Sequence, residues 1–277
     1  MRTSFTIGLS ARPFEGEGES DVKAVILAGG FGTRLTEESV VRPKPMVEIG
    51  GRPILWHIMK LYSHFGIMDF ILCLGYKGDM IRDYFLNYGT MNSDVRVHIG
   101  ERNVEHLEPF HDEEKWRVLL AETGLATQTG GRIHRAGKYV EGDEFMVTYG
   151  DGVADVDLQA LLEFHRKQGK LATVTGVRPA SRFGELHIRG DLAEEFREKP
   201  QLDEGWINGG FFVFKRKALD YIGPDTILER DPLERLARDG QLAVFRHEGY
   251  WRPMDTMRER RALEEEWASG KPPWKVW

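Results

Sequence analysis

The feature that most constrains the fold is a short apolar run that ends in glycines. Residues 22–27 read Val-Lys-Ala-Val-Ile-Leu and pass directly into Ala28-Gly29-Gly30-Phe31-Gly32. A run of this length, rich in branched residues and bounded by glycines, is typical of a buried strand that enters a loop. Since open parallel sheets bind ligands beyond the carboxyl ends of their strands, this loop is the first candidate for a binding site.

Alternating helices and strands are expected to follow. Pro53 is predicted to open a helix whose apolar residues fall on one stripe, with Gly66 at its C-terminal cap. A second strand is predicted over 69–74, and a later one over 145–149, which ends in Gly150-Asp151-Gly152. Strand, helix and strand in this order form a βαβ unit, whose crossover is right-handed.

The second half of the chain continues the pattern with one change. A helix is predicted over 157–168 and a strand over 171–177, whereas the short segments within 183–214, separated by glycines, indicate mixed or antiparallel strands. The C-terminal part is predicted to hold two helices and one strand between them, over about 231–239, 256–268 and 242–246 respectively. The expected fold class is therefore α/β, with three layers, a mixed but mostly parallel sheet and a C-terminal helical appendage.

Length and composition are consistent with one main domain. A chain of 277 residues, 41% of them hydrophobic, can bury one sizeable core, which we assign to residues 21–277. Residues 1–20 are expected to form a flexible N-terminal extension. The single cysteine, Cys73, lies in an apolar run, where a buried structural thiol is expected.

Charge and hydropathy exclude two classes of partner. The formal charge is -6, with acidic and basic residues interspersed, so no basic surface for nucleic acid is expected. No stretch approaches the roughly 18 apolar residues of a membrane span, so no membrane partner is expected either. We therefore expect a cytoplasmic protein.

The glycine-rich loop is compatible with phosphate binding. Glycines allow backbone N–H groups to approach a phosphate closely. The loop is not a Walker P-loop, because no Gly-Lys-Ser/Thr follows, and Leu35 occupies the third glycine position of a dinucleotide fingerprint. A plain tight turn is the alternative interpretation.

Lys44 is the second candidate, because it lies between two prolines in Arg42-Pro43-Lys44-Pro45. The prolines restrict the backbone on both sides and are expected to hold the lysine out as a pre-positioned point charge. A solvated surface lysine is the alternative. Basic side chains beside a glycine-rich turn are what a triphosphate needs for charge neutralisation.

Two aspartates are candidate metal ligands. Asp151 lies between glycines at the end of a strand, and Asp255 lies just before a predicted helix. Asp-Gly is also a common turn pair, and Asp255 could cap that helix. Two carboxylates could instead hold Mg²⁺, which completes its shell with phosphate oxygens and water. No His-Glu-x-x-His pair and no Gly-x-Ser-x-Gly elbow is present, which disfavours zinc proteases and serine hydrolases.

These motifs together resemble a known family. Residues 23–35 and 42–45 resemble the signature of sugar-1-phosphate nucleotidyltransferases, and the resemblance extends over about 22–277. The blocks at 53–59, 148–155, 207–212 and 253–256 are most similar to the cytidylyl members. The resemblance implies a Rossmann-like, GT-A-like nucleotidyltransferase fold.

The resemblance also implies substrates and a reaction. Glucose 1-phosphate would attack the α-phosphorus of CTP in line, giving CDP-glucose and pyrophosphate with the help of Mg²⁺. It further implies a homo-oligomer and a place in the synthesis of dideoxyhexoses for surface polysaccharide. A UTP- or dTTP-dependent enzyme and a non-catalytic sugar-nucleotide-binding relative remain alternatives.

The resemblance assigns roles to individual residues. Backbone groups would bind nucleotide at Leu27, Ala28, Gly29, Gly30, Phe31 and Gly150. The triphosphate would be held by Gly32, Thr33, Arg34 and Lys44. Thr127 and Arg132 match positions that recognise cytosine. The sugar phosphate would be bound by Glu198, Lys199, Asn208 and Gly209. Asp151 and Asp255 would hold the metal and act in catalysis together with Arg34 and Lys44.

Overall fold

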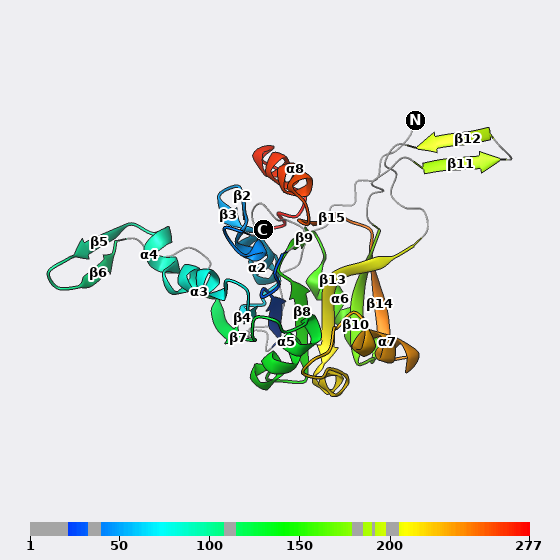
Figure 1. Cartoon of the computed structure of the whole chain (residues 1–277), viewed down its shortest axis with the longest axis horizontal. Helices are drawn as coiled ribbons and strands as arrows, with labels where there is room; N and C mark the ends of the chain where they lie inside the picture. The colour runs from blue at the N-terminus through cyan, green and yellow to red at the C-terminus, as the bar shows by residue number, and fades with distance from the viewer. Residues whose placement is uncertain (1–21, 33–39, 108–114, 179–184, 190–191, 198–204) are drawn as a thin grey trace.

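A seven-stranded sheet forms the centre of the molecule (Figure 1). The computed structural model describes residues 22–32, 40–107, 115–178, 185–189, 192–197 and 205–277. The sheet has the strand order β14-β10-β13-β8-β1-β4-β7. In sequence order its strands are β1 (Lys23–Leu27), β4 (Asp69–Leu74), β7 (Arg117–Glu122), β8 (Glu144–Tyr149), β10 (Ala172–Val177), β13 (Ile207–Lys215) and β14 (Leu242–His247).

One strand of this sheet runs against the others. β13 pairs antiparallel with both β8 and β10, whereas the pairs β1–β4, β1–β8, β4–β7 and β10–β14 are parallel. The prediction of a mixed, mostly parallel sheet is confirmed. Because β13 is reversed, its first residues lie at the same edge of the sheet as the carboxyl ends of its neighbours.

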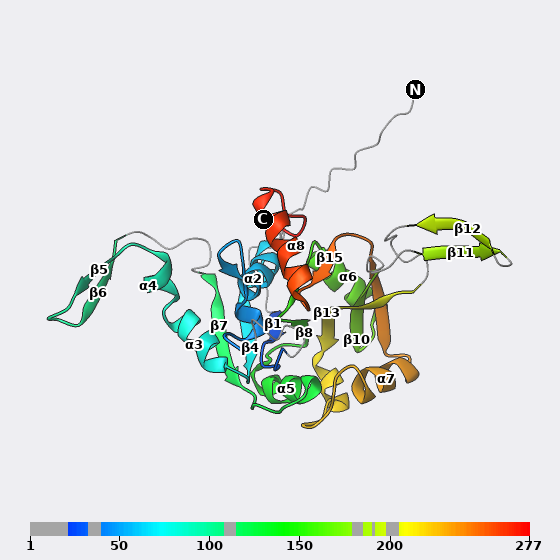
Figure 2. The same cartoon turned by 45° about the horizontal axis from the view of Figure 1, so that its top comes forward.

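Successive side chains along each strand point to opposite faces of the sheet and contribute to two hydrophobic layers. In β1, Ala24 and Ile26 belong to one core cluster while Val25 belongs to the other. The same alternation places Phe211 in the first cluster and Phe212 in the second. The first cluster includes residues of α2 (Ile54–His64), α3 (Gly78–Leu86), α6 (Leu158–Gln168) and α8 (Met257–Ala268), and the second includes residues of α5 (Thr129–Ala136) and α7 (Asp231–Arg238). The expected three layers are therefore present (Figures 1 and 2).

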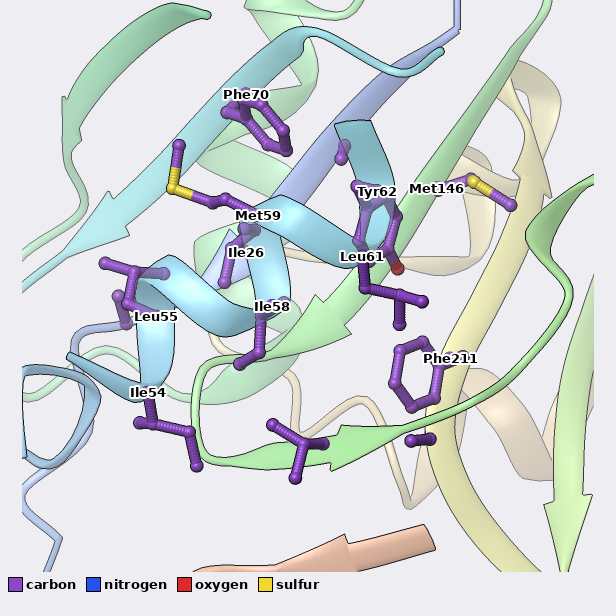
Figure 3. Packing of buried hydrophobic residues seen from close by; sticks show 14 of the residues in the cluster. Ile26, Ile54, Leu55, Ile58, Met59, Leu61, Tyr62, Phe70, Met146 and Phe211 are labelled. Carbon is purple, nitrogen blue, oxygen red and sulfur yellow. The ribbon is translucent and has the colours of Figure 1, made fainter. Parts of the chain in front are cut away.

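Helix α2 packs its apolar face on the sheet (Figure 3). Its side chains Ile58, Met59 and Tyr62 are each at most 1% exposed, and the Tyr62 ring stacks on Phe211 with centroids 6.4 Å apart. Pro53 is the N-cap of α2 and Gly66 follows its end with φ +78°, a backbone conformation that favours glycine. The predicted helix between these two residues is confirmed.

The C-terminal segment packs against the same helix. Trp274 is 1% exposed and its indole Nε1 donates to His57 Nδ1 at 3.4 Å. His57 Nε2 lies 2.9 Å from the carbonyl oxygen of Ile49. If Nδ1 accepts from Trp274, then Nε2 carries the proton and donates to Ile49, so both contacts agree with one neutral tautomer.

Predicted and observed boundaries agree closely where an apolar run is bounded by glycine or proline. The strand over 69–74 is β4, and the helix over 157–168 is α6, with Asp157 as its N-cap accepting from Ala160 N at 2.8 Å. Sequence analysis did not predict α3, α5 or β7 as elements. It also did not predict the short elements η1 (Lys44–Met46), β2 (Glu48–Ile49), β3 (Arg52–Pro53), α4 (Tyr88–Asn92), η3 (Gly137–Tyr139), β9 (Gly152–Ala154), η4 (Arg216–Tyr221) and β15 (Trp251–Pro253).

Two hairpins extend from the body of the molecule at opposite ends (Figures 1 and 2). One is formed by β5 (Val95–His98) and β6 (Asn103–His106), and the other by β11 (Glu185–Arg189) and β12 (Leu192–Arg197). The second hairpin confirms the antiparallel strands predicted within 183–214. Of the helices in the part of the chain that the structure describes, none combines the length and the apolar character needed to cross a membrane.

We predict that two buried histidines make the fold sensitive to acid. Burial lowers the pKa of His57 and of His165 to about 4 each, against about 6.5 in an unfolded chain. The unfolded state therefore binds more protons as pH falls from about 6.5 towards 4, and stability falls with it. Each histidine should contribute about 2 kcal/mol to the loss of unfolding free energy between pH 7 and pH 5.

Urea unfolding of the unchanged chain and of His165→Gln, at about pH 7 and about pH 5, measures this contribution. The carboxylates titrate in both proteins, so the difference between the two pH-dependent losses isolates His165. An equal loss of unfolding free energy in both proteins would contradict the assignment.

Candidate functional site

The loop after β1 lies between the carboxyl ends of two neighbouring strands. Ala28 N donates to Cys73 O at 3.2 Å, and Gly150 N donates to Leu27 O at 3.1 Å. A Cβ on Gly29 would lie 2.2 Å from Arg132 Nη1 and 2.8 Å from the backbone N of Gly75, so only glycine fits there. The loop therefore has a defined path, set by contacts to β4, to the residue after β8 and to Arg132.

Three charged side chains from distant segments meet beside this loop. Lys44 Nζ lies 2.6 Å from Asp151 Oδ2 and 2.6 Å from Asp255 Oδ1. Lys44 belongs to η1, Asp151 follows β8, and Asp255 precedes α8. Met254 N donates to Asp151 O at 2.8 Å, which holds the two acidic segments together.

Asp255 is not the cap of the following helix. Thr256 is the N-cap of α8 and forms a reciprocal capping box with Glu259. The Glu259 carboxylate accepts from the backbone N–H of Asp255 at 2.8 Å. The capping interpretation of Asp255 is therefore wrong, and its side chain meets Lys44 instead.

The expectation that the two prolines hold Lys44 out from the chain is also wrong. Its side chain is 8% exposed, and both flanking prolines are buried with it. The prolines direct the chain through η1, which turns the lysine inward onto the two carboxylates. Burial works to lower the pKa of Lys44, but the carboxylates of Asp151 and Asp255 outweigh it and raise this pKa above its ordinary value. Lys44 is therefore a cation at neutral pH.

A cavity of about 520 Å³ opens over these residues. It is lined by many of the residues that the sequence predicts for nucleotide and metal binding, namely Leu27, Ala28, Gly30, Phe31, Gly32, Lys44, Thr127, Arg132, Gly150, Asp151 and Asp255. Gly29 packs directly against the Arg132 side chain. Residues from five separate parts of the chain thus share one concave surface.

A second cavity of about 410 Å³ adjoins the first. Tyr149, Asp151 and Asp255 line both cavities. The predicted sugar-phosphate residues Asn208 and Gly209 line the second one. They come from the first residues of β13, which the reversed direction of that strand brings to this edge of the sheet.

Arg132 holds the wall of the first cavity together. Its Nη2 donates to Gly29 O at 2.8 Å, and its Nη1 approaches Leu74 O at 3.0 Å and Thr123 Oγ1 at 2.7 Å. Further contacts go to the carbonyl oxygens of Gly124 and Leu125. Arg132 is 3% exposed, and burial lowers the pKa of its guanidinium. Recognition of cytosine by Arg132 stays a prediction, and the structure adds an anchoring role towards the glycine-rich loop.

Four predicted site residues are not described by the structure, and two residues that were not predicted line the second cavity. Thr33, Arg34, Glu198 and Lys199 lie outside the described residues. Sequence analysis missed Tyr149 and Glu229, which line the second cavity. Tyr149 could have been found as the residue before Gly150-Asp151, but Glu229 lies in a turn with no local signal. Among the described residues, no three His, Cys, Asp or Glu side chains come together as a metal site.

Comparison with known proteins gives consistent relationships. Residues 23–256 match the model of the family described as nucleotidyl transferase. The chain is 53% identical over 260 residues to the glucose-1-phosphate cytidylyltransferase of Salmonella typhimurium, covering 92% of this chain and 100% of that protein. It is 44% identical over 258 residues to the probable glucose-1-phosphate cytidylyltransferase of Bacillus subtilis, with the same coverage.

A solved structure is similar over nearly the whole fold. HddC from Yersinia pseudotuberculosis, complexed with GMP-PN, superposes with a TM-score of 0.64 and 26% sequence identity. The match covers 89% of this chain and 99% of that one. The family model, the relatives and the shared fold agree, and the chain belongs to the nucleotidyl transferase family.

Proposed function

We propose that this chain transfers the cytidylyl group of CTP to glucose 1-phosphate, giving CDP-glucose and pyrophosphate. The observation that carries the proposal is the junction of two cavities at Asp151 and Asp255, beside a buried lysine. The larger cavity suits a nucleoside triphosphate and the smaller one a hexose phosphate. The relatives in Salmonella typhimurium and Bacillus subtilis support the choice of substrates.

The reaction needs positioning and charge neutralisation more than acid–base chemistry. A phosphate oxygen of glucose 1-phosphate forms a bond to the α-phosphorus of CTP, and the bond from that phosphorus to the β-phosphate oxygen breaks. Pyrophosphate leaves with the bonding electrons, so no enzyme group becomes covalently attached. The junction of the two cavities is where both phosphates would meet, and the ammonium of Lys44 supplies positive charge there.

The two aspartates fit a magnesium ion. Their carboxylates approach one point from two segments, and oxygen donors are what this cation prefers. Asp151 and Asp255 would hold it, with the remaining positions filled by phosphate oxygens and water. When bound, Mg²⁺ supplies neutralisation of the charge on the transferring phosphoryl group. Lys44 neutralises part of the charge of the two carboxylates at this point.

The part of the larger cavity around Thr127 suits a nucleobase. Thr127 and the loop around it line this cavity, and α5 begins directly after Gln128. Cytosine presents acceptors at O2 and N3, which hydroxyl, guanidinium or backbone donors can satisfy. We assign base contacts to Thr127 and Arg132 on this chemistry. A homo-oligomer and a cytoplasmic location remain predictions.

The first test is pyrophosphate release from glucose 1-phosphate and Mg²⁺, with CTP, UTP, dTTP and ATP compared at equal concentrations. We expect the highest kcat/KM with CTP. A higher kcat/KM with UTP or dTTP than with CTP would show that the enzyme prefers another nucleotide. No release with any nucleotide, from protein with an intact unfolding transition, would favour the non-catalytic alternative.

Replacement of either aspartate should remove turnover without loss of the fold. We expect Asp151→Ala and Asp255→Ala to lower kcat by at least about 100-fold, a size typical for loss of a group that stabilises charge in the transition state. Asp143→Ala is the matched control, because Asp143 is exposed and lines neither cavity. Near-normal kcat in folded Asp151→Ala or Asp255→Ala would overturn the assignment.

Replacement of Arg132 should act on the nucleotide side. Arg132→Ala is expected to raise KM for CTP by about 10-fold or more and KM for glucose 1-phosphate much less, because the anchor of Gly29 and the base contact are both lost. Arg135→Ala removes a contact to the segment after β7, which Arg132 also contacts, namely Arg135 Nη1 to Thr123 O at 2.7 Å, and serves as control. Equal increases in both KM values would count against a nucleotide-specific role.

A further inference from the structure

A chain of hydrogen bonds runs between the two cavities through Glu229. The Tyr149 hydroxyl donates to Glu229 Oε1, and the Thr129 hydroxyl donates to Glu229 Oε2 at 2.7 Å. Asn208 Nδ2 donates to the Tyr149 hydroxyl oxygen at 3.2 Å. Thr129 lines the first cavity, Asn208 lines the second and Tyr149 lines both. None of the roles assigned above uses Glu229.

The protonation states of Tyr149 and Glu229 determine which group donates in each of these hydrogen bonds. A tyrosine hydroxyl carries its proton at neutral pH. The phenol is therefore neutral and keeps its proton. A carboxylate can only accept, so Tyr149 must donate to Glu229 and must accept from Asn208.

The same contacts define the orientation of the Asn208 amide. Its Oδ1 accepts from Gly210 N at 2.8 Å while its Nδ2 donates to Tyr149. A flipped amide would lose both bonds, so one orientation is favoured. Among the described residues, the second N–H of Nδ2 has no acceptor. It is available to an oxygen of a ligand in the second cavity.

Close packing keeps the Tyr149 ring in place. Gly210 has φ +83°, and a Cβ there would lie 2.5 Å from Tyr149 Cδ2. The ring therefore lies directly against the backbone of β13. At the other end, Thr129 Oγ1 accepts from Leu228 N at 2.9 Å, and the Leu228 side chain is fully buried. Glu229 is thus attached to a turn that the core holds in position.

We infer that Glu229 is a positioning residue for sugar binding: its carboxylate orients Tyr149, and Tyr149 orients the Asn208 amide so that an N–H is presented to a hexose hydroxyl. The inference rests on the proposed function for the identity of the ligand. It assigns to Glu229 and Tyr149 a contribution to the affinity for the sugar and little contribution to the affinity for the nucleotide. Loss of one such neutral hydrogen bond corresponds to a change of roughly 2- to 12-fold in affinity.

Calorimetric binding of CDP and CDP-glucose to the full chain tests this contribution without turnover. The ratio of Kd for CDP to Kd for CDP-glucose measures what the glucosyl group adds. We expect this ratio to fall about 3- to 10-fold in Tyr149→Phe and in Glu229→Ala, and less in Glu229→Gln, which keeps an acceptor for the tyrosine. The Kd for CDP should change less than about 2-fold in Tyr149→Phe. The double variant Tyr149→Phe/Glu229→Ala should lose no more than the worse single variant, because both act through one path.

Matched controls come from a second tyrosine–carboxylate pair. The Tyr221 hydroxyl donates to Asp239 Oδ2 at 2.9 Å, and neither residue lines either of the two cavities described above. Tyr221→Phe and Asp239→Asn should leave the ratio unchanged. Thermal unfolding of every variant separates loss of fold from loss of affinity.

The outcomes separate the inference from the proposed function. An unchanged ratio in Tyr149→Phe, additive losses in the double variant, equal losses in the controls, or no preference for CDP-glucose over CDP in the unchanged chain would each overturn the inference. Absence of pyrophosphate release from CTP and glucose 1-phosphate overturns the proposed function alone, because the binding ratio does not depend on turnover.

Discussion

The attraction between one buried ammonium and two carboxylates is the interaction on which the site depends. Lys44 is separated from Asp151 by 107 positions and from Asp255 by 211 positions, yet its Nζ lies 2.6 Å from an oxygen of each. Two carboxylates this close would repel without a cation between them. The lysine therefore offsets the repulsion between these two side chains, while the bond from Met254 N to Asp151 O and the pairing of β9 with β15 hold their segments together. With three charges of net -1, the cluster also suits a further cation when anionic substrates enter.

Elements with local signals could be predicted from the sequence. β1, β4, α2 and α6 are apolar runs bounded by glycine, proline or an N-cap, so their limits agree with the structure. Helix α5 lacks such signals because it contains Gly130 and Gly131 within its first turn. These glycines let the helix approach another segment, and a Cβ on Gly131 would lie 2.2 Å from Pro224 O. Tertiary packing therefore stabilises α5 against its weak intrinsic propensity.

The residues of the site differ in the same way: some have local sequence signals and others do not. Asp151, Asn208 and the glycines after β1 belong to recognisable sequence blocks, so their membership of the site could be predicted. What they touch could not. The inward direction of Lys44 depends on partners in two other segments, and Glu229 reaches Thr129 across 100 positions. Arg132 likewise contacts Gly29 across 103 positions. Hydrogen bonds of this range follow from the completed fold, and no local pattern encodes them.

The reversed direction of β13 has a consequence for how the chain tolerates change. The nucleotide side of the site follows the ends of parallel strands, whereas Asn208 and Gly209 stand at the beginning of an antiparallel one. Loops after the parallel strands can therefore vary in length without altering strand register, but β13 carries its site residues inside the ladder. A slip of one residue would exchange Phe211 and Phe212 between the two core layers and turn Asn208 to the opposite face of the sheet. Hydrophobic packing on both faces of β13 thus fixes its register, and the register determines the face of the sheet on which Asn208 lies.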